Sequence, residues 1–231
     1  MIIALNNKSN LNKDEFLNYL KELESISYNK LILCPTYINI PLFNLNNIEL
    51  GSQNVSKYNT GAHTGEVAAS VLKSYGVKYS IVGHSERREN GTSLEDTNIK
   101  IKRLLENDMI PILCVGENIE LRKNNTYIEY INKEIEVAIK DLNETDISKI
   151  IIAYEPIYSI GTGLIPKNEE IEEVITNIKN KLPNNKVLYG GSVNEDNIDI
   201  LNKISNIDGY LLGGISLKPN NLKVLINKII K

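Results

Sequence analysis

The stretch Ile150-Ile151-Ile152-Ala153-Tyr154 is an unbroken apolar run, and Glu155 ends it. The next apolar run is Val187-Leu188-Tyr189. Between the two, apolar residues recur at helical spacing, at Ile171, Val174, Ile175, Ile178 and Leu182. Two short runs without polar alternation, separated by an amphipathic helix, are typical of buried parallel strands in a β-α-β unit.

This unit recurs along the whole chain. Short apolar runs flanked by Gly, Pro, Asn or other polar residues stand at 2–5, 31–34, 48–50, 79–82, 110–115, 150–154, 187–189 and 209–212. Amphipathic segments predict helices at 14–23, 99–105, 128–142, 171–182 and 222–229, and a short one containing Pro41 at 38–45. Eight strand–helix units predict a single-domain (β/α)8 barrel over residues 1–231, a fold that typically needs ~250 residues. An open doubly wound sheet is the alternative.

Composition narrows the class of protein. Of 231 residues, 42% are apolar and 24% charged, with a net charge of -3, which is ordinary for a globular chain and gives no sign of nucleic-acid or membrane partners. No apolar stretch approaches the roughly 20 residues of a membrane helix, and the N-terminal run is too short for a signal peptide. Cys34 and Cys114 form no motif and are expected to be reduced thiols, so we expect a cytoplasmic protein.

In such a barrel the chemistry lies where the strands end. Asn6 and Lys8 follow the first run, and strand alternation places them on the same side of an extended segment. An amide donor beside a cation suits an anionic intermediate. The ordinary alternative is a pair of solvated loop residues.

Ionisable residues also gather after the fourth and sixth runs. His84 is one of only two histidines and lies in Gly83-His84-Ser85-Glu86-Arg87-Arg88. A histidine that only forms a hydrogen bond with nearby backbone does not need so many ionisable neighbours, so this cluster favours a functional role. Glu155 is a carboxylate beside apolar residues, and closure of the site over it could change its basicity. The glycines of 161–163 offer backbone N–H groups to an anion and allow a lid to move, although a plain glycine turn has the same composition.

Two glycine pairs follow the seventh and eighth runs. They are Gly190-Gly191, with Ser192 after it, and Gly213-Gly214, with Ser216 nearby. These loops form the common phosphate site of (β/α)8 barrels, because glycine lets the backbone approach phosphate oxygens and serine adds a donor. One pair alone is equally typical of a tight turn, but two pairs in consecutive units favour a phosphate site.

With these motifs, the chain resembles the triosephosphate isomerase family from the first predicted strand to the last helix. The most specific segments are Gly83 to Arg88 and Tyr-Glu-Pro-Ile-Tyr-Ser-Ile-Gly-Thr-Gly at 154–163. The remaining resembling segments are 6–8, 53–55, 61–66, 189–193 and 213–219. The resemblance implies a TIM barrel that interconverts dihydroxyacetone phosphate and glyceraldehyde 3-phosphate, a reaction of glycolysis and gluconeogenesis, with no cofactor and no metal.

The resemblance also implies residue roles. Glu155 would move a carbon-bound proton, neutral His84 would polarise the carbonyl, Lys8 and Asn6 would stabilise the enediolate, and Glu86 would sit beside Lys8. The phosphate would be bound by Gly161, Ser192, Gly213 and Gly214. The lid would consist of Pro156, Ile157, Tyr158, Ser159, Ile160, Thr162, Gly163, Leu164, Ile165 and Pro166, together with Gly161.

A loop at 56–66 has little apolar content and two glycines, which fits a solvated loop or a binding loop. Its segment 61–66 resembles the family's interdigitating loop. The resemblance implies a homodimer in which His63, Thr64 and Gly65 dock beside the partner's active site, with Thr64 near Glu86 and Asn6 of the other subunit.

Several positions depart from the family pattern. Asn7 and His63 stand where aromatic residues are usual, and Tyr158 replaces a tryptophan. Leu164-Ile165-Pro166 replaces the usual far end of the lid, and the segment after Arg88 is about a residue short and lacks a usual acidic residue. Two other functions remain open: a different phosphate-binding barrel isomerase, and an inactive phosphosugar-binding or scaffold protein.

Overall fold

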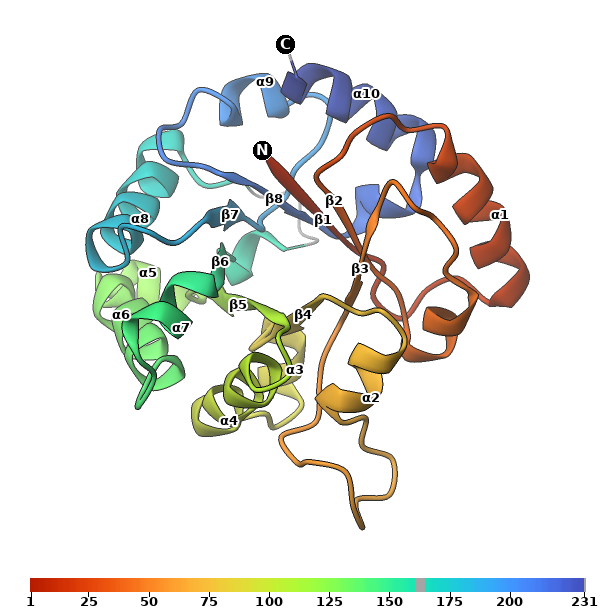
Figure 1. Ribbon diagram of the computed structural model, residues 1–231. Helices are drawn as coiled ribbons and strands as arrows, with labels where there is room; N and C mark the ends of the chain where they lie inside the picture. Colours follow the sequence, from red (N-terminus) through yellow and green to blue (C-terminus); the bar gives the residue numbers. More distant parts are fainter. Residues whose placement is uncertain (161–164, 231) are drawn as a thin grey trace.

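A computed structural model describes residues 1–160 and 165–230 (Figure 1). In this part of the chain, eight parallel strands close into one barrel in chain order, and β8 pairs with β1. The strands are β1 Ile2–Asn6, β2 Leu31–Cys34, β3 Glu49–Ser52, β4 Tyr79–Val82, β5 Ile110–Val115, β6 Ile151–Tyr154, β7 Val187–Tyr189 and β8 Gly209–Leu212. The (β/α)8 prediction is confirmed, and the open sheet is excluded.

Helices surround the barrel (Figure 1). They are α1 Lys13–Glu24, η1 Tyr37–Leu42, α2 Ala69–Ser74, α3 Ser85–Glu89, α4 Leu94–Leu105, α5 Ile119–Lys123, α6 Tyr127–Ala138, α7 Glu144–Lys149, η2 Ile157–Ser159, α8 Asn168–Lys181, α9 Ile198–Leu201, η3 Gly214–Leu217 and α10 Pro219–Ile230. The short helices α2, α5, α7 and α9 were not predicted, because a helix of one or two turns shows too little periodicity.

Several predicted boundaries differ from those of the structure, and two of the differences have identifiable reasons. The third strand runs on to Ser52, whose hydroxyl donates to Ser80 Oγ at 2.8 Å inside the barrel, so a polar residue continues the strand. The helix predicted to reach residue 142 ends at Ala138. Asp141 has a φ of 63°, a left-handed turn that ends the helix although the apolar pattern continues to Leu142.

The core has two layers, set by strand alternation. Within β1, Ala4 belongs to the cluster that fills the barrel, whereas Ile3 and Leu5 pack in the larger cluster with helix residues such as Phe16. Cys34 and Cys114 are both free and lie in the inner cluster, and burial raises the pKa of the Cys34 thiol to about 12. Within the described residues, no helix is both long and apolar enough to cross a membrane.

Barrel closure leaves no room for a side chain at the start of β8. A Cβ added to Gly209 would lie 1.9 Å from the carbonyl oxygen of Ile2, its partner in β1. We expect Gly209→Ala to lower the free energy of unfolding by about 1–3 kcal/mol, because backbone must shift to relieve the clash. Urea denaturation measures this, with Gly214→Ala as the control, since an added Cβ there meets nothing within 4 Å. Equal stability of the two variants would contradict the closure argument.

Candidate active site

A cavity of about 270 Å³ opens where the strands end. The predicted residues Asn6, Lys8, His84, Glu155, Ser192, Gly213 and Gly214 all line it, together with Ile160, Gly190, Gly191, Val193, Asn194, Leu211, Leu212 and Ile215. The barrel therefore brings together groups that follow β1, β4, β6, β7 and β8. Gly161, Thr162, Gly163 and Leu164 lie outside the described residues.

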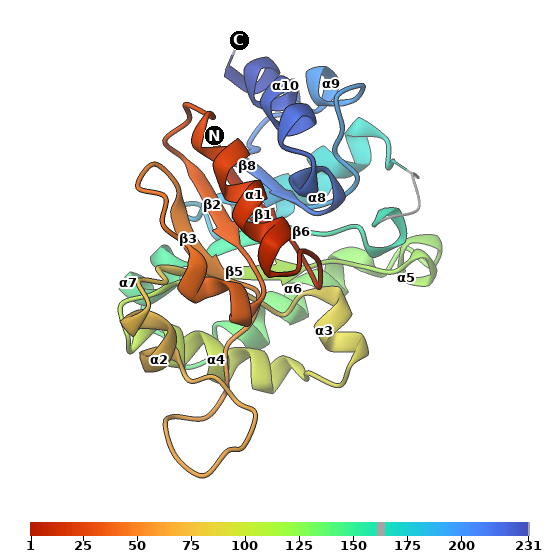
Figure 2. The same cartoon turned by 90° about the vertical axis from the view of Figure 1, so that its right-hand side faces the viewer.

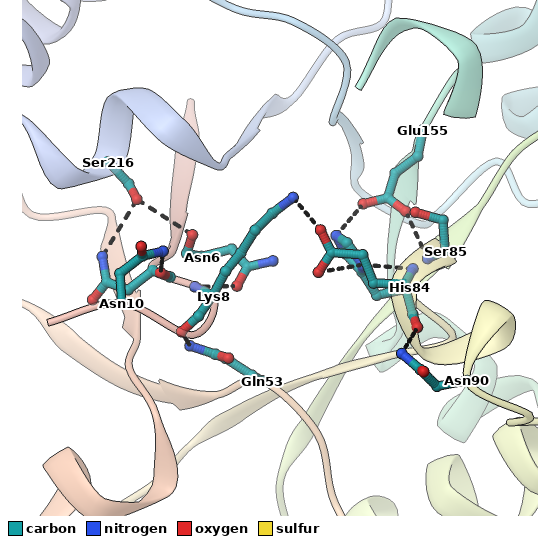
Figure 3. A network of polar contacts seen from close by, with 11 residues as sticks. Asn6, Lys8, Asn10, Gln53, His84, Ser85, Asn90, Glu155 and Ser216 are labelled. Carbon is teal, nitrogen blue, oxygen red and sulfur yellow. Dashed lines mark hydrogen bonds and ion pairs between the residues drawn. The ribbon is translucent and has the colours of Figure 1, made fainter. Parts of the chain in front are cut away.

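Lys8 reaches the cavity by a turn, not by strand alternation. Strand β1 ends at Asn6, and Lys8 has a φ of 52°, in the left-handed region that costs a non-glycine residue about 1–3 kcal/mol. Hydrogen bonds hold this turn: the Lys8 N–H donates to Asn6 Oδ1 at 3.1 Å, and Gln53 Nε2 donates to the Lys8 carbonyl at 2.8 Å (Figure 3). Lys8 lines the cavity beside Asn6, but a left-handed turn places it there and not the extended geometry that we expected.

A polar network lies behind this turn, where the resemblance led us to expect an aromatic residue. Asn7 is buried and its Nδ2 donates to Tyr19 Oη and Ser216 Oγ, both at 3.3 Å. The Ser216 hydroxyl in turn donates to the Asn6 carbonyl at 3.3 Å. Ser216 therefore supports the end of β1, and it is not among the residues that line the cavity.

Glu86 neutralises Lys8 from outside the cavity. Lys8 Nζ lies 2.5 Å from Glu86 Oε1, and both side chains are partly exposed. Glu86 lines a neighbouring cavity that also includes Lys8 and His84. The two were predicted to be neighbours on the basis of resemblance alone, because their side chains are 78 positions apart in sequence.

The hydrogen bonds of His84 define its tautomer. His84 caps α3, and its Nδ1 accepts the N–H of Glu86 at 3.2 Å. A nitrogen that accepts carries no proton, so the ring is neutral and its proton sits on Nε2. That Nε2 lies 3.2 Å from Glu155 Oε1, and the His84 side chain is 7% exposed.

Glu155 is buried and held from two sides. Its Oε1 faces His84, and its Oε2 accepts the Ser85 N–H at 3.4 Å (Figure 3). A Cβ at Gly116 would lie 1.8 Å from the Glu155 carbonyl oxygen, and one at Gly190 would lie 3.1 Å from Glu155 Cγ. Glycine is required at Gly116, where a Cβ would collide with backbone, whereas at Gly190 a Cβ would press on the Glu155 side chain by a few tenths of an ångström.

The first part of the predicted lid is tied to the side of the cavity that Ser192 lines. Residues Ile157–Ser159 form the 3-10 turn η2, and the Ser192 hydroxyl donates to the Ser159 carbonyl at 2.5 Å. Ile165 is exposed and Pro166 is buried at the far end. The glycines at 190, 191, 213 and 214 expose backbone on this wall, next to the side chain of Ser192.

Sequence reasoning missed a second group of buried polar residues beside the site. Glu117 is 0% exposed and bonds both Arg122 and Tyr154, the neighbour of Glu155. Gln53 was noted only as part of a resembling segment. Nothing in the sequence marks these residues, since single polar residues after a strand are common in loops. No cluster of three or more potential metal ligands occurs in the described ranges.

A (β/α)8 barrel whose strand ends join a carboxylate, a neutral imidazole and a lysine beside glycine-rich loops is a barrel enzyme built for proton transfer on an anionic substrate. Residues 1–229 match the family model described as triosephosphate isomerase. A triosephosphate isomerase of Clostridium botulinum (strain Langeland) is 37% identical over 98% of both chains. Those of Mycoplasmopsis agalactiae and Mycoplasma capricolum are 42% and 43% identical over 87% and 78% of this chain, and over 80% and 77% of their own lengths.

The chain belongs to the triosephosphate isomerase family. It is an isomerase that interconverts dihydroxyacetone phosphate and glyceraldehyde 3-phosphate, which is a step of glycolysis. Membership in this family excludes the alternative of a different phosphate-binding barrel isomerase.

The tautomer of His84 is directly testable. ¹⁵N NMR should show an unprotonated Nδ1 and a protonated Nε2 at neutral pH, because Nδ1 is occupied by the Glu86 N–H. His63, the other histidine of the chain, is exposed and gives a second set of ring signals for comparison. A proton on His84 Nδ1 at neutral pH would show that this reading of the site is wrong.

Proposed function

We propose that residues 1–231 form one cytoplasmic catalytic domain in which Glu155 and His84 carry out the isomerisation without a cofactor or metal. Glu155 removes a proton from one carbon of the triose phosphate and returns it to the adjacent carbon. The His84 Nε2–H polarises the carbonyl and shuttles protons between the enediolate oxygens. The observation that carries this assignment is the 3.2 Å contact between His84 Nε2 and Glu155 Oε1 in one cavity.

Lys8 and Asn6 stabilise the enediolate. Lys8 is the one Lys or Arg among the described residues that line the cavity, so the attraction for an anion comes from it and from dipoles. Glu86 keeps Lys8 in place through their ion pair. A substrate must also draw the Glu155 carboxylate from His84 and Ser85, which occupy its oxygens in this structure.

The phosphate group binds to Gly161, Ser192, Gly213 and Gly214, and the lid at 156–166 closes over it. The hydrogen bond between Ser192 and the Ser159 carbonyl supports a coupling of the two, because lid movement must change a contact of the phosphate wall. Closure excludes water, so the enediolate is kept from losing its phosphate.

The protein is proposed to act as a homodimer. The loop between β3 and α2 projects from the barrel in both views (Figures 1 and 2). A second cavity of about 320 Å³ adjoins the active site and includes Tyr37, Glu86 and Arg87. Ile38, next to Tyr37, is 81% exposed, which favours cover by a partner.

A second copy of the chain supplies an occupant for this cavity, with Thr64 near Glu86 and Asn6. His63 stacks on Tyr58 with ring centroids 3.9 Å apart, so it shapes the loop that carries Thr64 and Gly65.

Glu155→Gln tests the base. The amide keeps the shape but has no basic lone pair, so we expect kcat to fall by ~10²–10⁴-fold or more. A coupled assay with glyceraldehyde 3-phosphate measures turnover, and binding of glycerol 3-phosphate should survive. Glu169→Gln is the matched control, because Glu169 is exposed on α8. Near-normal turnover of Glu155→Gln would reject the assignment, and an inactive wild-type protein would favour the scaffold alternative.

Thr64→Arg tests the dimer. A bulky cation at the loop tip should prevent docking, so sedimentation velocity at micromolar concentration should show a monomer. Activity should fall by about 10²-fold, because misplacement of Lys8 and His84 by ~1 Å is enough for such a loss. Thr145→Arg, on the exposed surface of α7, should stay dimeric and active. A wild-type protein that sediments as a fully active monomer at neutral pH would refute the dimer.

A further inference from the structure

Arg122 lies at the centre of a buried polar cluster that the isomerisation chemistry described above does not use. The cluster consists of Arg122 on α5, Glu117, Tyr127, Tyr154 and Tyr158. Arg122 Nη2 lies 3.1 Å from Glu117 Oε1 and donates to Tyr154 Oη at 3.1 Å. Its guanidinium also stacks over the Tyr127 ring, 3.9 Å from the centroid. The Arg122 side chain is only 11% exposed, so these contacts form in a dry environment where they are strong.

One side of the cluster reaches the catalytic base. Tyr154 directly precedes Glu155 in the chain, and its side chain is fully buried. The Tyr154 hydroxyl donates to Glu117 Oε1 at 3.1 Å while it accepts from Arg122. The end of β6 is therefore fixed by hydrogen bonds at the residue before Glu155.

The other side of the cluster reaches the first turn of the lid. The N–H of Ile157 donates to the Glu117 carbonyl at 3.0 Å. Burial raises the pKa of Tyr158, and its hydrogen bond to Arg122 opposes that rise. The turn η2 is thus attached to the cluster through its backbone at Ile157 and through its side chain at Tyr158.

The ionic pair in the cluster is incompletely satisfied. Glu117 Oε2 and Arg122 Nε are buried without a hydrogen-bond partner among the residues that the structure describes. Burial raises the pKa of Glu117, against the attraction of Arg122. An apolar pair of the same size would avoid such costs, so stability alone does not account for this arrangement.

We propose that Arg122 is a positioning residue of the isomerisation, because its guanidinium holds the Tyr154–Glu155 segment and the lid turn in one fixed arrangement. This inference rests on the proposed roles of Glu155 and the lid. A planar guanidinium suits the task, since it donates in several directions and stacks on an aromatic ring at the same time. A lysine would supply the charge but not this geometry.

The expected effect concerns the fate of the enediolate as well as the rate. When the lid is poorly held, the enediolate breaks its C–O bond to phosphate, and inorganic phosphate leaves together with an unsaturated carbonyl product. Isomerisation returns the proton to carbon and releases no phosphate. The ratio of released phosphate to isomerised product therefore reports on the lid, whereas kcat reports on the base.

Arg122→Lys and Arg122→Ala test the proposal. We expect each to lower kcat by on the order of 10-fold or more with little change in KM, and to raise the phosphate ratio at least several-fold. Guanidinium ion should partly restore both quantities in Arg122→Ala, whereas methylammonium should not. Lys123→Ala is the matched control, since Lys123 is the next residue of α5 and is exposed. Tyr158→Phe should raise the phosphate ratio with a smaller effect on kcat, because it removes only the hydroxyl at the lid.

Two outcomes would overturn the proposal. One is unchanged kcat and phosphate ratio in both Arg122 variants. The other is a loss of activity that follows only the loss of folded protein, seen by circular dichroism, with an unchanged ratio and no rescue by guanidinium. Failure of the base assignment gives a different result, because Glu155→Gln would then retain turnover. The Arg122 variants would still differ from the wild-type protein in the ratio of released phosphate to isomerised product.

Discussion

The pairing of β8 with β1 is the constraint on which the site depends. It closes the barrel and places the two ends of the chain side by side: Asn7 bonds Ser216, 209 positions away in sequence. A Cβ at Gly213 would lie 3.4 Å from Lys8 Cε, so the glycine loop after β8 lies next to the lysine after β1. Without closure, Lys8 would not lie beside the glycine-rich loop that we propose to bind the phosphate.

Closure also explains how a chain of net charge -3 attracts an anionic substrate. Two unit charges 4 Å apart attract by ~1 kcal/mol in water but by ~4 kcal/mol at an effective dielectric of about 20. The attraction between Lys8 and an anion is therefore stronger inside the cavity than it would be at the surface. The neutral ring of His84 leaves Lys8 as the cation of the cavity. A charged His84 would compete with Lys8 for Glu86 and would bind the Glu155 carboxylate more tightly.

Most strands could be predicted from the sequence because both of their faces are buried. The runs at 31–34, 79–82, 110–115, 187–189 and 209–212 match β2, β4, β5, β7 and β8 in both bounds. Prediction of element bounds from apolar residues fails in two situations. One is a polar pair that is hydrogen-bonded inside the barrel, as at Ser52 and Ser80. The other is a turn that interrupts an apolar pattern, as at Asp141.

The candidate site likewise contains residues that could be predicted from the sequence and residues that could not. Residues that stand directly at strand ends, such as Glu155, were found because the fold fixes where strand ends point. The left-handed turn at Lys8 and the cluster around Arg122 were not found. Both depend on side-chain contacts between segments far apart in the chain, and single polar residues carry no periodic signal for such contacts.

Two of the proposed site residues, Lys8 and Glu155, share one further property: each is supported from behind by a network of hydrogen bonds. Asn7, Tyr19 and Ser216 lie behind Lys8, while Arg122 and its partners lie behind Glu155. Apolar contacts tolerate small sliding movements, whereas hydrogen bonds weaken steeply with angle and so fix direction. Buried atoms left without a partner among the described residues, Asn7 Oδ1 behind Lys8 and Glu117 Oε2 behind Glu155, show what this costs. Position has been favoured over stability at the two places where a displacement of ~1 Å would reach the reacting atoms.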